Sequence, residues 1–392
     1  MLEKTFSDDK VSKNLEFDAD IVPRLYSSKK KSLPNEIPLN TPYSVHIDIC
    51  SICNFRCSYC FQADRDAKKL SGLKEGMMTF DLFKKIIDDL KEFDQPVKKI
   101  KIGNNGEPML HKDFPKMVAY IKESNVTEII EVFTNGSKLS PKLNKEIIDA
   151  GMDIINVSLQ GLTSERYKEV AGIKIDMEKL IRNISNLYEV RKNCKLYVKV
   201  IDQTYALEKG NNRQFVFTKK EREYFYNTFG NICDEIFIEK VAPQWPDAQV
   251  DKQNRDATTG IFGQKINKKR EICGFPFMYL CYTPFGVVHP CMLDWSNQLV
   301  IGNAKNDSAK AIWNGKKMRD LRIAMARGER SKVDVCKNCD ALTVCMDDDL
   351  DSHKEKIFEV YNVTKEEIHG KNQWVKNEGE KRKGEHVLKF SV

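Results

Sequence analysis

The chain has 392 residues, of which 41% are hydrophobic, so it is long enough for one large domain and a smaller one with a sizeable buried core. Neither a signal peptide nor a membrane span is expected, because the first residues are charged and no apolar run approaches about eighteen residues. The net charge of +7 is spread along the chain without an aromatic-interleaved basic stripe. We therefore expect a cytoplasmic protein with neither a nucleic-acid nor a membrane partner.

The predicted elements begin with a polar, lysine-containing arm over residues 1–42. From Tyr43 onward, strand-like and helix-like segments alternate. The expected strands are 43–49, 98–104, 127–135, 153–160, 195–202 and 235–242. The expected helices are 80–93, 115–124, 141–151, 177–192 and 219–230. This series predicts an α/β fold, a partial (β/α)6 TIM-like barrel, over residues 43–250.

The second half of the chain predicts a different kind of domain. A linker or long loop is expected at 243–271, and a small cysteine-rich domain over residues 251–350. Residues 351–392 are expected to form a C-terminal helix and a basic tail. The chain has twelve cysteines, and in a reducing compartment these favour metal ligation over disulfides.

Apolar and polar residues alternate along the expected strands, although buried parallel strands are normally apolar throughout. In 43–49, for example, Val45 and Ile47 alternate with His46 and Asp48. Because successive side chains point to opposite faces, the apolar set is expected to meet the helices and the polar set to line the barrel lumen. This predicts a cavity for a polar guest; the alternative is that the polar residues only satisfy one another.

Three cysteines lie close together after the first expected strand, at Cys53, Cys57 and Cys60. Four-iron clusters usually take four cysteines, so a compact set of three would leave one iron free for another ligand. Zinc is the alternative, but zinc sites favour paired C-x2-C units. The spacing C-x3-C-x2-C, with Tyr59 before the last cysteine, resembles the signature of the radical S-adenosylmethionine (SAM) enzymes. The resemblance implies that SAM binds the open iron of a 4Fe-4S cluster and is cleaved to methionine and a 5′-deoxyadenosyl radical.

Further segments at the ends of expected strands resemble the SAM-binding motifs of this family. The segment GNNGEPML resembles its GGEP motif, with Asn105 in place of the first glycine. The resemblance implies that Glu107 or exposed backbone carbonyls bind the ammonium group of SAM, and that Ser158 contacts the ribose. The other implied cofactor contacts are Tyr59, Gly106, Pro108, Asn135, Gln160, Lys199 and Val241.

The cysteine-rich segment resembles the SPASM domain of the same superfamily. It shares the order C…G-x4-C, then IGN…IWNG…MRDLR, then C-x2-C-x5-C. A full SPASM domain binds two auxiliary four-iron clusters, but Asp349 replaces the next cysteine here. The resemblance therefore implies at least one auxiliary 4Fe-4S cluster, as in the smaller twitch domains, or a second cluster with Asp349 as a ligand. The simplest ligand set is Cys273, Cys291, Cys336 and Cys339, with Cys345 or Cys281 as further candidates; a zinc ribbon is the alternative.

Both resemblances imply an anaerobic enzyme that removes a hydrogen atom from its substrate through the adenosyl radical. If the attacked carbon bears a hydroxyl, further loss of a proton and an electron gives a ketone. The auxiliary cluster would accept the electron, and Asp294, His46 or Asp48 the proton. A reducing flavodoxin or ferredoxin is implied as the electron donor.

The substrate is expected to be a small polar molecule, such as a sugar, an aminosugar or a related alcohol. The short arm, the missing terminal cysteines and the polar lumen favour this hypothesis. The alternatives are a peptide maturase or epimerase, in which Cys281 or Cys345 could return a hydrogen atom, and a non-enzymatic iron–sulfur or zinc scaffold.

Overall fold

The computed structural model describes residues 15–24, 31–205, 214–241, 245–246, 248, 260–261, 270–345, 349–370 and 372–375. Its centre is a ten-stranded sheet with the order β1-β9-β6-β5-β4-β3-β2-β10-β11-β12. Neighbouring parallel strands form the barrel wall: β2 (Ser44–Ile47), β3 (Val97–Ile102), β4 (Thr127–Thr134), β5 (Ile154–Leu159), β6 (Lys195–Ile201) and β9 (Glu235–Glu239). All six predicted strands are confirmed, and the sheet is a partial barrel because its order has two ends.

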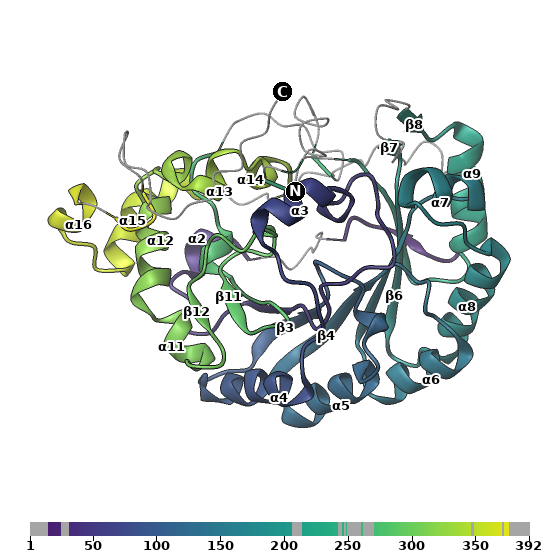
Figure 1. The fold of residues 1–392 in the computed structure, drawn as a ribbon, viewed down its shortest axis with the longest axis horizontal. Helices are drawn as coiled ribbons and strands as arrows, with labels where there is room; N and C mark the ends of the chain where they lie inside the picture. Colours follow the sequence, from purple (N-terminus) through teal and green to yellow (C-terminus); the bar gives the residue numbers. More distant parts are fainter. Residues whose placement is uncertain are drawn as a thin grey trace.

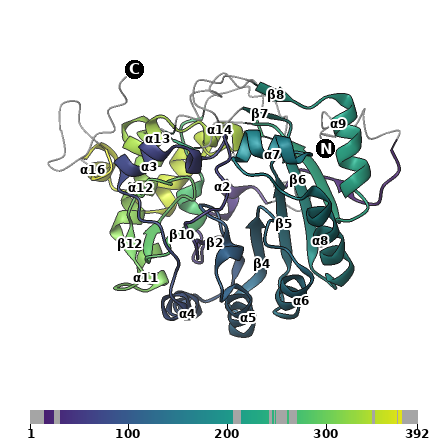
Figure 2. The ribbon, with the colours of Figure 1, turned by 45° about the vertical axis from the view of Figure 1, so that its right-hand side comes forward.

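Helices cover the outer face of this wall (Figures 1 and 2). They are α4 (Phe80–Asp89), α5 (Phe114–Ser124), α6 (Pro141–Asp149), α8 (Met177–Val190) and α9 (Lys219–Phe229), which match the predicted helices. Side-chain oxygens begin several of them, since Thr79 caps α4, Ser140 caps α6 and Asp176 caps α8. Two shorter helices, α3 (Arg65–Ser71) and α7 (Ser164–Ala171), lie outside the predicted segments.

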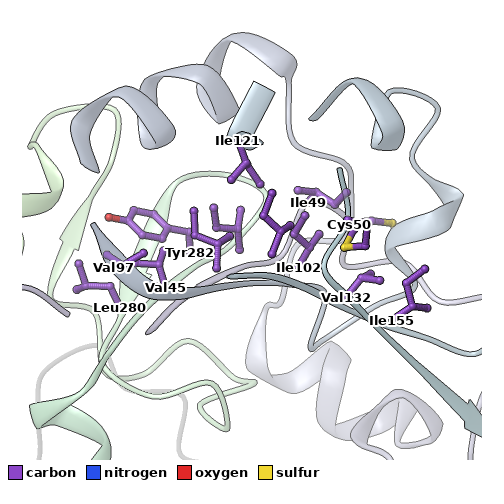
Figure 3. Close-up of a cluster of buried hydrophobic side chains, with 14 of the residues drawn as sticks. Val45, Ile49, Cys50, Val97, Ile102, Ile121, Val132, Ile155, Leu280 and Tyr282 are labelled. Carbon is purple, nitrogen blue, oxygen red and sulfur yellow. The ribbon is translucent and has the colours of Figure 1, made fainter. Parts of the chain in front are cut away.

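The apolar residues of the alternating strands pack against these helices. Val45, Ile102, Val132 and Ile155 are buried and lie in one apolar cluster with Ile121 of α5 (Figure 3). Burial of each such side chain stabilises the folded protein by roughly 1.5–3 kcal/mol relative to leaving it exposed. The intervening polar residues therefore face the inner side of the sheet, as the alternation predicts.

Segments outside the predicted barrel extend both edges of the wall. At one edge, β1 (Asp20–Ile21) pairs in parallel with β9, and Phe17 stacks on Tyr226 with ring centroids 5.5 Å apart. At the other edge, β10 (Tyr279–Tyr282) pairs in parallel with β2 and continues into antiparallel β11 (Val287–His289) and β12 (Gly302–Asn303). The cysteine-rich segment is thus joined to the barrel through the sheet itself.

The other elements lie around this framework. They are α2 (Leu33–Glu36), β7 (Gln203–Tyr205), β8 (Gln214–Val216), α11 (Ala309–Trp313), α12 (Lys316–Ala326), α13 (Asp334–Lys337), α14 (Ala341–Cys345), α15 (Lys354–Val360) and α16 (Lys365–His369). The loop predicted at 243–271 and the basic tail lie largely outside the described residues. Among the helices that the structure describes, none has the length and apolar character needed to cross a membrane.

Candidate active site

The triad of Cys53, Cys57 and Cys60 lies in a loop after β2 that backbone hydrogen bonds hold from two sides. The amide of Glu107, in the loop after β3, donates to Ile52 O over 2.9 Å. The amides of Arg56 and Ser58 donate to carbonyls in the last turn of α7, over 3.0 and 2.8 Å. The loop therefore has a defined shape around the triad.

Burial raises the pKa of all three triad thiols. The pKa rises to about 11 for Cys53 and about 12 for Cys60. That of Cys57 rises well above its ordinary value, because of burial and then of the neighbouring Cys60 and Cys53. The three thiols are thus within electrostatic reach of one another. Thiols in such an apolar site become thiolates only beside a cation, so the donor set fits a metal cluster.

The G-E-P loop after β3 makes a close backbone contact with the triad loop. At Gly106 an added Cβ would lie 2.2 Å from Cys50 O and 2.9 Å from Ile52 O, and backbone atoms cannot yield as a flexible side chain does. Glycine is therefore required here. The glycine of this motif brings two loops together at the triad.

Glu107 ties the loops after β3 and β4 together. Its buried carboxylate accepts hydrogen bonds from Met109 N (3.0 Å), Thr134 Oγ1 (2.8 Å) and Asn135 N (2.7 Å). Burial nevertheless raises its pKa to about 7. Since these donors occupy the carboxylate, the arrangement favours backbone carbonyls as partners for the ammonium group of SAM. Pro108 begins the short 3-10 helix that follows.

Two of the predicted cofactor residues lie directly at the triad. Asn135 Nδ2 donates to Asn54 Oδ1 over 2.9 Å and lies 3.9 Å from Cys53 Sγ. The hydroxyl of Tyr59 interacts with the Cys57 thiol. Both positions can therefore influence a cluster held by the triad.

The other predicted cofactor residues lie at or beyond the carboxyl ends of β5, β6 and β9. Gln160 Nε2 donates to Ser158 O over 3.0 Å, while its buried Oε1 has no hydrogen-bond partner among the described residues. Such an orphaned acceptor fits a site that takes a ligand. Lys199 on β6 is ion-paired with Glu239, and Val241 is half-buried beyond β9.

Four cysteines of the second set also influence one another. Burial raises the pKa of the Cys291 thiol, and the charges of Cys273 and Cys339 raise it further. The pKa of Cys336 rises for the same reason, with further contributions from Cys339 and Cys273. These cysteines lie in the turn before β10, after β11, and in α13 with the turn after it. Four cysteines match the number of ligands that a 4Fe-4S cluster takes. Among the described residues no three His, Cys, Asp or Glu side chains form a group that could hold a single metal ion, so this ligand set stays a prediction.

Arg330, which no sequence motif predicted, organises this second site. It is buried, and its Nη1 donates to Cys336 O over 2.6 Å and to Cys339 O over 2.9 Å. Its charge lowers the pKa of the Cys273 and Cys336 thiols against the stronger effect of burial. The guanidinium therefore favours the thiolate forms that bind iron.

The remaining candidate ligands make other contacts. Cys345 ends α14 and packs against the same apolar cluster as Cys273, Cys291 and Cys339, and it also interacts electrostatically with Arg24 and Lys199 on the barrel. Asp349 Oδ1 accepts a hydrogen bond from Asp351 N over 3.0 Å. Their participation in a cluster stays a prediction.

Among the predicted proton acceptors, Asp48 has the most distinctive surroundings. Its Oδ1 accepts hydrogen bonds from the amides of Asn104 (2.7 Å) and Asn105 (3.1 Å), and burial raises its pKa to about 6. His46 is buried, and burial and then Lys101 lower its pKa well below its ordinary value, so its ring stays neutral. Its Nε2 has no hydrogen-bond partner in the described part of the chain.

Asp294 has a structural part in the loop after Cys291. Its carboxylate accepts hydrogen bonds from Leu299 N (2.7 Å) and Gln298 N (3.0 Å) and lies 3.1 Å from His289 Nδ1. His289, which was not predicted from the sequence, also lowers the pKa of Asp48, against the larger effect of burial. Asp294 therefore fixes a histidine beside the other carboxylate.

The sequence analysis missed most of the charged residues on the inner face of the sheet. Lys99 and Lys101 lie on β3, Glu131 on β4 and Glu239 on β9. The alternation of the two lysines with isoleucines was an available signal for them. No local pattern marks Arg24, because it reaches Glu239 from the N-terminal segment.

Comparison with known proteins identifies the two halves of the molecule. Residues 47–209 match the radical SAM superfamily, and residues 273–340 match the iron–sulfur cluster-binding domain SPASM. A crystal structure of anSMEcpe with bound AdoMet shares the fold, with a TM-score of 0.52 and 15% identity, covering 82% of this chain and 96% of that one. The chain is therefore a radical SAM enzyme with a C-terminal SPASM domain. Its cofactors are SAM, a SAM-binding 4Fe-4S cluster and at least one auxiliary 4Fe-4S cluster.

Curated relatives resemble a part of the chain. A tungsten-containing aldehyde ferredoxin oxidoreductase cofactor-modifying protein of Pyrococcus furiosus is 34% identical over 33% of this chain and 33% of its own length. A probable GTP 3′,8-cyclase of Methanococcus maripaludis is 36% identical over 35% of this chain and 43% of its own. The chain thus spans less than half the length of these two relatives.

Proposed function

We propose that the protein is an oxidoreductase that removes a hydrogen atom from a small polar substrate, a sugar, an aminosugar or a related alcohol. When bound, SAM and its cluster supply the radical chemistry for this removal, and the auxiliary cluster supplies an acceptor for one electron. The triad would hold the SAM-binding cluster. The auxiliary cluster would be held by Cys273, Cys291, Cys336 and Cys339.

The position of Asp48 carries this proposal. It follows β2, five positions before Cys53, and its Oδ1 accepts a hydrogen bond from the amide of Asn104 over 2.7 Å. The side chain of Asn104 in turn donates to Met292 O, next to Cys291, over 2.7 Å. A proton acceptor thus lies near both thiol sets. Oxidation of an alcohol requires such an acceptor, and a carboxyl group with a pKa of about 6 is ionised at neutral pH.

The polar inner face of the sheet supports a small polar substrate. His46, Lys101 and Glu131 lie side by side on β2, β3 and β4. The matched relatives named GTP 3′,8-cyclase agree with this class, because GTP is itself a small polar molecule.

A second candidate is a peptide maturase or epimerase. The observation that favours it is the buried thiol of Cys281, beside Asp48 and Asp294. A thiol in this position could return a hydrogen atom to a substrate radical, which an epimerase requires and a dehydrogenase does not.

The first test is cluster assembly and SAM cleavage. After anaerobic reconstitution and reduction with dithionite, flavodoxin or ferredoxin, the wild-type protein should release 5′-deoxyadenosine from SAM. The Cys53→Ala, Cys57→Ala, Cys60→Ala variant should release none, while it keeps the iron of the auxiliary site. Full SAM cleavage by this variant would overturn the assignment of the triad.

The second test distinguishes the two candidate reactions. Candidate alcohols deuterated at the reacting carbon should transfer deuterium to 5′-deoxyadenosine. A product two mass units lighter than the unlabelled substrate supports dehydrogenation. A product with inverted configuration and the mass of the unlabelled substrate, in which hydrogen has replaced deuterium, supports the epimerase instead.

A further inference from the structure

Among the described residues, the inner face of the barrel groups four half-buried cations with two buried carboxylates. Six side chains form this group, which we call the lumen charge cluster: Arg24, Lys99, Lys101, Lys199, Glu131 and Glu239. Four are cations and two are carboxylates, so two positive charges are in excess within this group of described residues. Buried charges normally have partners, because an unpaired one loses its hydration without compensation.

Each carboxylate is shared by two cations. Glu131 Oε2 lies 2.8 Å from Lys99 Nζ but 3.8 Å from Lys101 Nζ. Glu239 is ion-paired with Lys199, and its other oxygen lies 3.4 Å from Arg24 Nε. Lys101 and Arg24 are therefore the less tightly paired member of each group.

Lys101 and Arg24 also approach the same aromatic ring. The Arg24 guanidinium lies 5.0 Å and Lys101 Nζ 5.6 Å from the centre of the Phe133 ring. Burial, followed by repulsion from Lys99 and Arg24, lowers the pKa of Lys101 to about 8 despite the opposing effect of Glu131. These two cations thus share one region around the Phe133 ring.

The cluster expected at the triad does not explain the excess. The strongest charge interactions of the triad thiols are with one another, with Glu107 and with Lys68. The lumen cations interact most strongly with Glu131 and Glu239. The buried Nε2 of His46, beside Lys101 in the strand register, is a further polar atom without a partner in the described residues.

We propose that the lumen charge cluster binds an anionic group of the substrate, a phosphate or a carboxylate, through Lys101 and Arg24. This inference rests on the proposed function for the location of the substrate, and it narrows the substrate from a polar alcohol to one that carries negative charge. A lysine and an arginine converging on one region are suited to such a group.

Anion binding tests this assignment without any turnover of SAM. The reconstituted protein, unreduced and supplied with SAM, is titrated calorimetrically with inorganic pyrophosphate and, separately, with citrate at constant ionic strength. We expect Lys101→Met and Arg24→Met each to weaken binding of the preferred anion at least about tenfold, because each removes a charge-assisted contact. The tighter probe identifies the substrate group as phosphate or carboxylate.

Lys98→Met is the matched control, because Lys98 is the neighbour of Lys99 on β3 but is exposed and ion-paired with Glu128. It should bind both anions as the wild type does. When Lys101 is replaced, Glu131 is still ion-paired with Lys99, and when Arg24 is replaced, Glu239 is still ion-paired with Lys199. Because neither carboxylate is left without a cation, circular dichroism should show that both variants are folded. If Lys101→Met does not fold, Arg24→Met carries the test.

Three results would overturn the proposal: neither anion binds the wild type, both lumen variants bind as the wild type does, or Lys98→Met loses as much affinity. Because SAM cleavage is not measured, failure here leaves the radical SAM assignment and the oxidation reaction untouched. Conversely, selective anion binding with no dehydrogenation of any alcohol would sustain the anion site and refute the proposed reaction.

Discussion

The ring of Phe61 stacks on the indole of Trp295, with centroids 5.1 Å apart and an angle of 23° between the planes. Phe61 follows the last cysteine of the triad directly, and Trp295 lies four positions after Cys291. Both are buried in an apolar cluster that also contains Trp245. This contact therefore joins the two cysteine loops of the molecule.

Trp295→Ala should destabilise the junction between the barrel and the SPASM domain. Removal of a buried tryptophan typically costs about 3–5 kcal/mol. Urea unfolding followed by circular dichroism measures this loss. Trp295→Phe is the control, since it keeps the stack and loses the hydrogen bond from Nε1 to Pro246 O. An alanine variant as stable as the phenylalanine variant would mean that the stack does not hold the junction.

Gly106→Ala should abolish SAM binding and cleavage while the auxiliary iron is retained. The added Cβ would meet Cys50 O at 2.2 Å, so the loop that carries the triad must move. Asn105→Gly, one position earlier, restores the glycine of the family motif and should leave SAM affinity within about twofold of the wild type. Equilibrium dialysis with labelled SAM measures both. Equal SAM affinity in both variants would contradict the role given to the contact between the loops.

Cys339→Ser and Cys345→Ser should differ in iron content. Cys339 interacts with Cys291 and Cys336, so its replacement should remove the auxiliary cluster, about four iron atoms per chain. Cys345 is outside the proposed set of Cys273, Cys291, Cys336 and Cys339, which already supplies four ligands, so its replacement should leave the iron content unchanged. Iron determination after reconstitution decides between them, and loss of iron from Cys345→Ser would make that cysteine a ligand.

Arg330→Met should weaken retention of the auxiliary cluster. It removes two hydrogen bonds to the carbonyls of Cys336 and Cys339 and a positive charge that favours the thiolates. Loss of groups that support ligands typically lowers metal affinity about 10–100-fold. Iron release to a chelator should therefore be faster than in the wild type. Arg330→Lys, which keeps the charge, should release iron at a rate between those of the wild type and Arg330→Met. If it releases iron as fast as Arg330→Met, the hydrogen bonds of Arg330, and not its charge, retain the cluster.

Asp48 should make the stability of the protein depend on pH. Burial raises its pKa from 3.8 to about 6, so the folded protein holds a proton that the unfolded chain has lost in this range. The free energy of unfolding therefore falls as the pH rises from about 4 to about 6. Above this range the buried carboxylate of Asp48 lowers the free energy of unfolding by roughly 3 kcal/mol. Glu107, whose pKa is about 7, adds a similar fall that continues to higher pH.

Asp48→Asn keeps an oxygen for the amides of Asn104 and Asn105 and removes the charge. We expect it to be more stable than the wild type at pH 7 and to vary less between pH 4 and about 6. Urea unfolding at several pH values measures both effects. Glu123→Gln, on the exposed face of α5, is the control and should follow the wild-type profile. Parallel profiles of wild type and Asp48→Asn would contradict the raised pKa.

The barrel wall was predictable because its signals are local. Each strand shows the alternation of Val45 and His46 or of Ile100 and Lys101, and an amphipathic helix follows most strands. β1 and β10 were not predicted, because each is short and pairs with a strand distant in the sequence. A pattern that spans a few residues cannot specify such a partner.

The candidate site was predictable to the same extent. The triad and the cysteines of the second set have characteristic spacings, so the sequence alone selects them. Arg330, His289 and Arg24 act through contacts that the fold creates, and nothing around them in the sequence distinguishes them from surface residues. The role expected of Glu107 also depends on the fold, since its carboxylate is occupied by donors from the next loop.

The placement of Arg24 has a practical consequence for work with this protein. The segment before the first barrel strand resembles a removable extension, yet it provides β1 along the open side of β9 and a cation beside Glu239. A shortened protein that begins at Tyr43 would still contain every cysteine of both sets and could be filled with iron. Such a preparation would have an altered barrel lumen. A normal iron content and a normal iron–sulfur absorbance would therefore not show that it is catalytically competent.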